Sequence, residues 1–287
     1  MIESLNVNMN EVVGNNDILF LSLDTLRYDV AKEEYEAGNL PNLCGSGGWE
    51  KRHSPGNYTY SSHHSFFIGF LPTPVEYEPL HKRDWLFLTK KTGLKSIKGS
   101  NTFLYEGSNI IEGLEKEGYK TICIGGVVFF SKMEGVYNVF PSMFQESYWN
   151  PKFGVTNPKS AEEQVKWAIK LLDKIDRDQR VFMFINISAI HGPNYYYLEK
   201  YKGMEEKTNG KRKNSIASKL DCVESQKAAL RYVDKCLEPL FNKMRERNRT
   251  FCIAVSDHGT CYGEDGYEGH IVSHDVVWNV PYRHFFL

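Results

Sequence analysis

Four short apolar runs constrain the fold of this 287-residue chain more than any other feature. They are Asp17–Leu23, Lys120–Gly125, Val181–Ile187 and Thr250–Ser256, each rich in Ile, Val or Phe. Their apolar residues are continuous, which is typical of strands that are covered on both faces. Segments with helical patterns lie between them, and such alternation favours a mostly parallel sheet with helices on both sides. We therefore predict an α/β fold built as a three-layer α/β/α sandwich.

Three of the intervening segments carry helix signals. Ser108–Lys116 begins with a serine, a common helix cap, and stops before Gly118. Ser160–Ile175 gathers its apolar residues on one face, and so does Val223–Met244, where they recur mainly at spacings of three and four. Both patterns predict helices that pack against a core.

The composition excludes several functional classes. Lys and Arg number 35 against 36 Asp and Glu, so the net charge of −1 provides no basic excess for general nucleic-acid binding. Six cysteines without a C-x-x-C pair are too few for a disulfide scaffold. No linker or repeat divides the chain, so we expect one domain over residues 1–287. Within it, the polar segment Tyr201–Lys219 is expected to be a mobile loop near the mouth of a site.

The N-terminal region predicts a cytoplasmic location. It has neither the basic n-region nor the apolar h-region of a signal peptide. Its longest apolar run, Ile18–Leu21, is far shorter than the roughly 20 residues that span a bilayer. We therefore expect a soluble cytoplasmic protein without a membrane partner, and the sequence leaves the oligomeric state open.

Carboxylate and imidazole side chains directly follow two of the predicted strands. Asp24 follows the first strand, and Asp257 and His258 follow the last. In an open parallel sheet, ligands bind beyond the carboxyl ends of the strands. A mixture of carboxylate and imidazole ligands suits Zn²⁺ or Mn²⁺ better than Ca²⁺. The alternatives are that Asp24 is a turn residue that caps the next helix and that the Asp-His pair forms an ordinary strand-end turn.

Three further residues carry groups that could act on an ester. Thr59 lies in a loop that we expect to enter a helix near Ser61 or Ser62, where unpaired N–H groups favour an anion. His191 follows the third strand, and His270 lies in a glycine-rich stretch further along. The alternatives are a helix cap for Thr59 and a histidine hydrogen-bonded to backbone for His191. Together with the metal candidates, these residues suit metal-assisted attack on a phosphorus or sulfur ester.

Five motifs that contain these residues occur in order along the chain: ILFLSLDTLRYDV, NYTYSSHHSFFIGFLPT, FINISAIHGPNY, VSDHGTCYGEDGYEGH and NVPYRHFFL. In this order they resemble the alkaline phosphatase / sulfatase superfamily of metallohydrolases over nearly the whole chain. Within it, the chain more closely resembles short bacterial sulfatase-like hydrolases that stop after the core sheet and have no assigned substrate. The resemblance implies an alkaline-phosphatase-like core and an enzyme.

The resemblance also implies a role for each matching residue. Asp24 matches the first metal ligand, and Asp257 and His258 match the ligands of the last motif strand. Thr59 lies where family members place the metal-bound Cys, Ser or Thr nucleophile. These four residues would hold about one Zn²⁺ or Mn²⁺ ion per chain.

Two histidines match the branch of the superfamily that transfers lipid headgroups. There, the counterparts of His191 and His270 hold the substrate phosphate or an extra zinc. Two-metal members also carry an Asp four residues before a His, but Ile187 occupies that place before His191. The resemblance therefore implies a substrate-binding role for the two histidines and leaves a second metal site open.

Three departures from the sulfatase pattern favour phosphorus over sulfur chemistry. Sulfatases carry a second Asp where this chain has Thr25, and they need a Cys or Ser that is oxidised to formylglycine, which Thr59 cannot become. The segment after Thr59 reads Tyr60-Ser61-Ser62-His63, without the Pro and Arg of the sulfatase motif. We expect the chain to lack the C-terminal subdomain of the family, which would leave substrate choice to inserted segments.

The sequence thus predicts a metal-dependent phosphate-ester or phosphonate-ester hydrolase or phosphotransferase. Thr59 would attack the ester and form a covalent phospho-threonine intermediate. The expected partner is a small anionic phosphate ester rather than a nucleic acid or a membrane. The alternatives are a non-catalytic protein that binds a metal and an anion and, with less support, a sulfatase or a phosphomutase.

Overall fold

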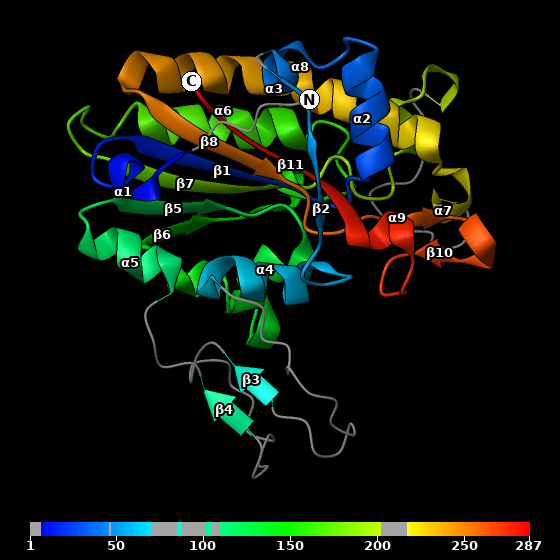
Figure 1. Ribbon diagram of the computed structural model, residues 1–287, viewed down its shortest axis with the longest axis horizontal. Helices are drawn as coiled ribbons and strands as arrows, with labels where there is room; N and C mark the ends of the chain where they lie inside the picture. Colours follow the sequence, from blue (N-terminus) through cyan, green and yellow to red (C-terminus); the bar gives the residue numbers. More distant parts are fainter. Residues whose placement is uncertain (1–6, 46, 70–84, 88–101, 105–108, 202–216) are drawn as a thin grey trace.

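The computed structural model describes residues 7–45, 47–69, 85–87, 102–104, 109–201 and 217–287. Its centre is a seven-stranded sheet with the strand order β2-β11-β8-β1-β7-β5-β6 (Figure 1). All neighbours from β8 to β6 are parallel, whereas β11 pairs antiparallel with both β8 and β2. The strands are β1 (Asp17–Leu23), β2 (Glu50–His53), β5 (Lys120–Ile124), β6 (Glu146–Tyr148), β7 (Val181–Ile187), β8 (Thr250–Val255) and β11 (Asn279–Phe286).

Helices cover both faces of this sheet (Figure 1). One face carries α2 (Tyr28–Glu36), α3 (Pro41–Cys44), α6 (Ser160–Leu172) and α8 (Val223–Arg247). The opposite face carries α4 (Thr59–Ile68) and α5 (Ile110–Lys116). The prediction of a three-layer α/β/α sandwich around a mostly parallel sheet is therefore confirmed.

The protein has two hydrophobic cores, one on each face of the sheet, and β1 contributes side chains to both. This follows because successive side chains of a strand point to opposite faces. Leu19 and Leu21 are fully buried in the core beneath α8, where Leu237 belongs to the same cluster. Phe20 belongs to the second core, which is rich in aromatic rings and includes Phe184 of β7. This double burial explains why the strand reads as a continuous apolar run.

The remaining elements are short. A separate two-stranded parallel pair consists of β3 (Trp85–Phe87) and β4 (Thr102–Leu104). Near the C-terminus, β9 (Cys261–Tyr262) and β10 (Glu268–Gly269) form an antiparallel pair. The others are α1 (Met9–Val12), α7 (Ala217–Leu220), α9 (Asp275–Trp278) and the 3-10 helices η3 (Val128–Phe130), η4 (Gly135–Asn138), η5 (Pro141–Met143), η6 (Pro151–Phe153), η7 (Tyr195–Tyr197), η8 (Glu199–Tyr201) and η10 (Glu264–Gly266).

Several predicted boundaries were wrong. Ser108 lies outside the described residues, and α5 is capped by Asn109, whose side chain accepts from the N–H groups of Ile111 and Glu112. α6 ends three residues before Ile175, and α8 continues past Met244. Such ends depend on tertiary contacts and last-turn geometry more than on the apolar stripe.

The predicted loop at 201–219 falls largely outside the described residues. Positions 202–216 are not described, while Tyr201 ends η8 and residues 217–219 belong to α7, so these two ends are not loop. In the described part of the chain, no helix is both long and apolar enough to cross a membrane.

Candidate metal centre and adjoining cleft

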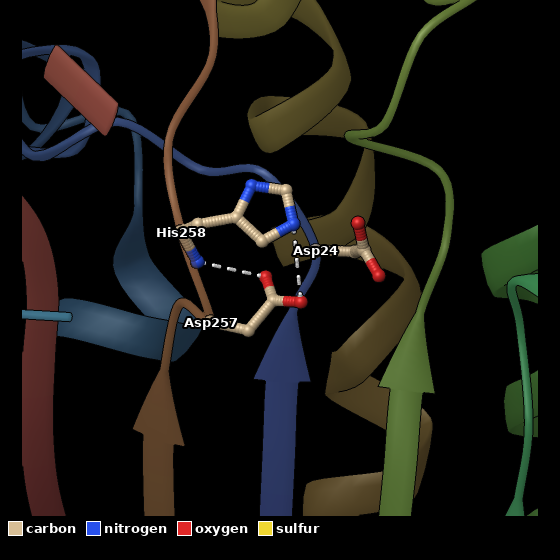
Figure 2. Close-up of side chains that lie close together, drawn as sticks. All are labelled: Asp24, Asp257 and His258. Atoms are coloured by element: carbon tan, nitrogen blue, oxygen red, sulfur yellow. Dashed lines mark hydrogen bonds and ion pairs between the residues drawn. The ribbon is translucent and has the colours of Figure 1, made fainter. Parts of the chain in front are cut away.

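The carboxyl ends of β1 and β8 bring the predicted metal ligands together. The two strands are parallel neighbours, with Ser22 paired to Val255, so the residues just beyond them are adjacent. Asp24 follows β1, and Asp257 and His258 follow β8. Figure 2 shows these three side chains converging beyond the strand ends.

The ligand atoms of these three side chains all lie within 4.8 Å of one another, and the residues are fully buried. Oδ1 of Asp257 accepts hydrogen bonds from the backbone N–H groups of Thr25 (3.1 Å) and His258 (3.0 Å). Oδ2 of Asp257 and Oδ1 of Asp24 have no hydrogen-bond partner. Among the described residues, this is the single cluster of three or more potential ligands of these types.

Burying two carboxyl groups side by side opposes their ionisation. Burial, reinforced by the charge of Asp257, raises the pKa of Asp24 to about 6. Burial likewise raises the pKa of Asp257 to about 7. A divalent cation would supply the missing positive charge and bind the two unpartnered oxygens. The residues present therefore fit a divalent metal ion, as the sequence predicted.

His258 is held in the tautomer that a metal ligand requires. Burial lowers its pKa, which favours the neutral ring. Its Nδ1 donates to the carbonyl oxygen of Gly259 at 2.9 Å, so Nε2 is left as the acceptor, 3.5 Å from Oδ2 of Asp257. A Cβ at Gly259 would overlap the backbone carbonyl of Val276. Only glycine allows these two backbone segments to approach this closely.

Thr59 lies over the metal-ligand cluster at the first residue of α4. Its hydroxyl Oγ1 is 3.5 Å from Oδ2 of Asp24 and 3.4 Å from Nε2 of His258. The expected helix start near Ser61 or Ser62 was wrong by two or three residues, because α4 begins at Thr59 itself.

The capping alternatives do not fit the structure. The N-cap of α4 is Tyr58, so Thr59 occupies the first helical position and directs its hydroxyl to the ligand cluster. The helix after β1 begins at Tyr28 with Arg27 as its N-cap, so Asp24 caps no helix there.

The two additional predicted histidines lie beside the cluster. The ring centroids of His258 and His270 are 4.6 Å apart, and those of His191 and His270 are 5.5 Å apart. Nδ1 of His191 is 2.6 Å from the carbonyl oxygen of Gly192. The structure therefore brings together all six residues that the sequence singled out.

Asn186 contacts this centre but was missed by sequence reasoning. Its Nδ2 donates to Oδ2 of Asp24 at 3.0 Å, and its Oδ1 accepts from the N–H of Val127 at 2.9 Å. The available signal was a polar residue within the apolar run VFMFINI. Ile187, at the position where two-metal members carry an Asp, is instead buried in the core.

His63 was also missed. Its Nδ1 donates to the carbonyl oxygen of Thr59 at 2.7 Å, and its Nε2 accepts from the hydroxyl of Ser22 at 3.0 Å. Burial lowers the pKa of His63 to about 3, so the ring is neutral. This histidine ties the start of α4 to the end of β1.

Thr25 contributes its backbone to the centre. Its N–H donates to Asp257, and its carbonyl accepts from Nε2 of Gln226 at 3.0 Å. Thr25 has a φ of 63°, a left-handed conformation that is unfavourable for a β-branched side chain. These contacts hold the turn after β1 in the shape that presents Asp24.

A cleft of about 400 Å³ adjoins the centre. Thr59, His191 and His270 contribute to its lining. The apolar part of the lining comes from Val127, Val128, Phe129, Trp149, Pro151 and Val155.

Comparisons with known proteins identify the family and the fold of this chain. A sequence profile described as Sulfatase matches residues 17–283. The fold is similar to the C-terminal periplasmic domain of phosphoethanolamine transferase EptC from Campylobacter jejuni (TM-score 0.58, 16% identity, covering 95% of this chain and 79% of the other). It is also similar to the C-terminal periplasmic domain of EcEptC from Escherichia coli in complex with Zn (TM-score 0.60, 14% identity, covering 94% of this chain and 72% of the other).

A third similar structure is the lipoteichoic acid synthase LtaP from Listeria monocytogenes (TM-score 0.55, 12% identity, covering 98% of this chain and 68% of the other). A search of curated proteins found no match. The profile match confirms the prediction of a sulfatase-like enzyme, and the similar structures confirm its fold. Because the profile spans nearly the whole sequence, the chain belongs to the sulfatase family.

Proposed function

We propose that this protein is a metal-dependent phosphate-ester or phosphonate-ester hydrolase or phosphotransferase with Thr59 as its nucleophile. The observation that carries the proposal is the position of the Thr59 hydroxyl, within 3.5 Å of both Asp24 and His258 at the start of α4. A nucleophile, a ligand cluster and an open cleft meet at this one point.

Asp24, Asp257 and His258 would hold the metal ion, with Thr59 as an additional oxygen ligand. This mixture of oxygen and nitrogen donors favours zinc or manganese. The zinc complex of the similar Escherichia coli domain is consistent with zinc. When bound, such an ion stabilises negative charge on oxygen and favours the ionised form of a hydroxyl ligand.

In the proposed reaction, the Thr59 hydroxyl releases its proton to water, and Oγ1 forms a bond to phosphorus as the bond to the leaving oxygen breaks. The N-terminal end of α4 favours the anionic phosphoryl group, because backbone N–H groups point out of a helix at that end. His191 and His270 lie where they can contact the other phosphoryl oxygens or give a proton to the leaving oxygen.

The covalent intermediate is compatible with either water or an alcohol as the second acceptor. The similar structures include phosphoethanolamine transferases and a lipoteichoic acid synthase, which supports transfer of a phosphoryl-linked group as one outcome. We propose a small phosphate ester as the substrate and the cytoplasm as the location.

The decisive experiment compares Thr59→Ala and Thr59→Ser with wild type on phosphate monoesters, diesters and phosphonate esters in Zn²⁺ or Mn²⁺. We expect the alanine variant to lose turnover while keeping its fold, and the serine variant to keep part of it, because serine retains an alkoxide at that position. Intact-protein mass spectrometry should detect a substrate-dependent phosphoryl adduct in wild type and none in the alanine variant.

Two results would count against the proposal. Near wild-type turnover by Thr59→Ala would exclude the covalent mechanism. No turnover of any ester by the metal-bound wild type would favour the alternative, a non-catalytic protein that binds a metal and an anion.

A further inference from the structure

The lining of the cleft beside the metal centre limits which substituents a substrate can carry. In the part of the chain that the structure describes, no Lys, Arg, Asp or Glu lines the cleft. A cationic substituent that entered it would lose water without gaining an ionic partner from this lining, which is costly. An apolar substituent would instead gain from removing its surface from water.

The aromatic side chains of the lining present rings rather than polar groups. Nε1 of Trp149 already donates to the carbonyl oxygen of Gly126 at 3.0 Å, so the indole N–H is used within the protein. The ring of Phe129 packs against those of Tyr58 and Tyr60 at centroid distances of 6.3 and 5.5 Å. These two tyrosines flank Thr59 in sequence, which ties this wall to the nucleophile.

The same wall is fixed relative to the metal ligands. Asn186 accepts from the N–H of Val127 and donates to Asp24, so one side chain joins the cleft to the centre. A Cβ at Gly126 would overlap the backbone carbonyl of Asn186, which shows how closely the two segments pack. The cleft wall is therefore held in a fixed position relative to the metal ligands. The volume of the cleft, about 400 Å³, suits a small ligand.

We propose that the cleft bordered by Val127, Val128, Phe129 and Trp149 is a specificity pocket for an uncharged apolar substituent, aryl or short alkyl, on the phosphorus centre of the substrate. This inference rests on the proposed function, because it assumes that the phosphoryl group lies at Thr59. Such a pocket would distinguish this protein from a transferase of headgroups that carry a cationic amine, such as phosphoethanolamine.

The test measures binding of simple phosphonates to the zinc-loaded full chain by calorimetry. Methylphosphonate, phenylphosphonate and 2-aminoethylphosphonate share one anionic group and differ only in the substituent. Burial of the ring predicts that phenylphosphonate binds about 10- to 100-fold more tightly than methylphosphonate. The aminoethyl compound should bind no better than the methyl compound.

Val128 and Met133 provide a matched pair of variants. Both are apolar residues on the same stretch of chain, and their solvent-exposed fractions are similar, 45% for Val128 and 49% for Met133. Of the two, only Val128 lines the cleft. Val128→Asp should reduce the phenyl-to-methyl affinity ratio by about tenfold and improve binding of the aminoethyl compound. Val128→Trp should reduce the same ratio by filling the cleft, whereas Met133→Asp should leave it unchanged.

The outcomes separate this inference from the proposed function. Equal affinities for the phenyl and methyl compounds, tightest binding of the aminoethyl compound, or an equal effect of Met133→Asp would overturn the pocket assignment. A clear phenyl preference without turnover of any ester would contradict the proposed function alone. Absence of binding by every phosphonate would contradict both.

Discussion

Replacing Asp257 by asparagine should stabilise the metal-free protein at alkaline pH. The substitution keeps the shape of the side chain, and an amide oxygen can still accept from the N–H groups of Thr25 and His258. The amide nitrogen would take the place of Oδ2, which has no hydrogen-bond partner and lies 3.5 Å from Nε2 of His258. The change therefore removes a buried charge with little loss of contacts.

The magnitude follows from the pKa of Asp257, which burial raises from 3.8 to about 7. The folded protein then holds a proton that the unfolded chain releases, so ionisation of this group opposes folding. The destabilisation is absent below pH 3.8 and is fully developed above pH 7. It amounts to about 4 kcal/mol at pH 8 and about 2 kcal/mol at pH 5.

Urea unfolding in the presence of a chelator would measure this difference at both pH values. Asp178→Asn, a change of the same chemistry at an exposed position, serves as the control and should leave the free energy of unfolding unchanged. Adding zinc at pH 8 should stabilise wild type by about 2.7 kcal/mol at a free concentration of 100 Kd, because a ligand of the folded state stabilises it. The same addition of zinc should increase the free energy of unfolding of Asp257→Asn much less, because the variant lacks one carboxylate ligand.

A lower stability of Asp257→Asn than of wild type at pH 8 in chelator would refute this reasoning. It would mean that groups of the protein itself already stabilise the buried carboxylate. The case for a cation at this position would then lose its electrostatic basis.

Three further predictions each concern the replacement of a single residue. Asn186→Ala should weaken metal binding by about 10- to 100-fold, because Asp24 loses the hydrogen bond that orients it, and competition with a metal indicator would measure this. An unchanged affinity would show that Asp24 needs no such support. Gly259→Ala should lower the midpoint of thermal unfolding, because its Cβ would overlap a backbone carbonyl; an unchanged midpoint would contradict the close approach. Arg27→Met should speed limited proteolysis between β9 and β10, where Glu264 begins η10, because the ion pair between the two side chains is lost. Equal cleavage rates in wild type and variant would argue against that role.

Local patterns in the sequence were sufficient for the layers of the fold. β1, β5, β7 and β8 match the four predicted strands to within one residue at their ends. A strand buried on both faces has no polar side, so its sequence shows one continuous apolar run. The edge strands β2 and β6 gave no such signal, because residues such as those of Glu146–Tyr148 are only partly buried.

The antiparallel strand β11 shows a second limit. Asn279–Phe286 contains a proline and a histidine and alternates buried with partly buried residues, so its apolar pattern is weak. Its place between β8 and β2 depends on pairing with residues far away in the sequence, such as Tyr282 with Val255. Nothing in the local sequence specifies such a partner.

The sequence by itself determined which residues are candidate metal ligands. Asp24, Asp257 and His258 directly follow apolar strands, and the carboxyl ends of these strands must share an edge if the sheet is parallel. Tertiary structure alone placed the Thr59 hydroxyl beside Asp24 and His258, which excludes the N-cap position and leaves the nucleophile as a proposal. A threonine at a helix start caps or reacts according to where its hydroxyl points, and that depends on the packing of α4 against the sheet. The roles of Asn186 and the cleft also came only from the fold, because both depend on contacts between segments far apart in the chain, such as Asn186 with Val127.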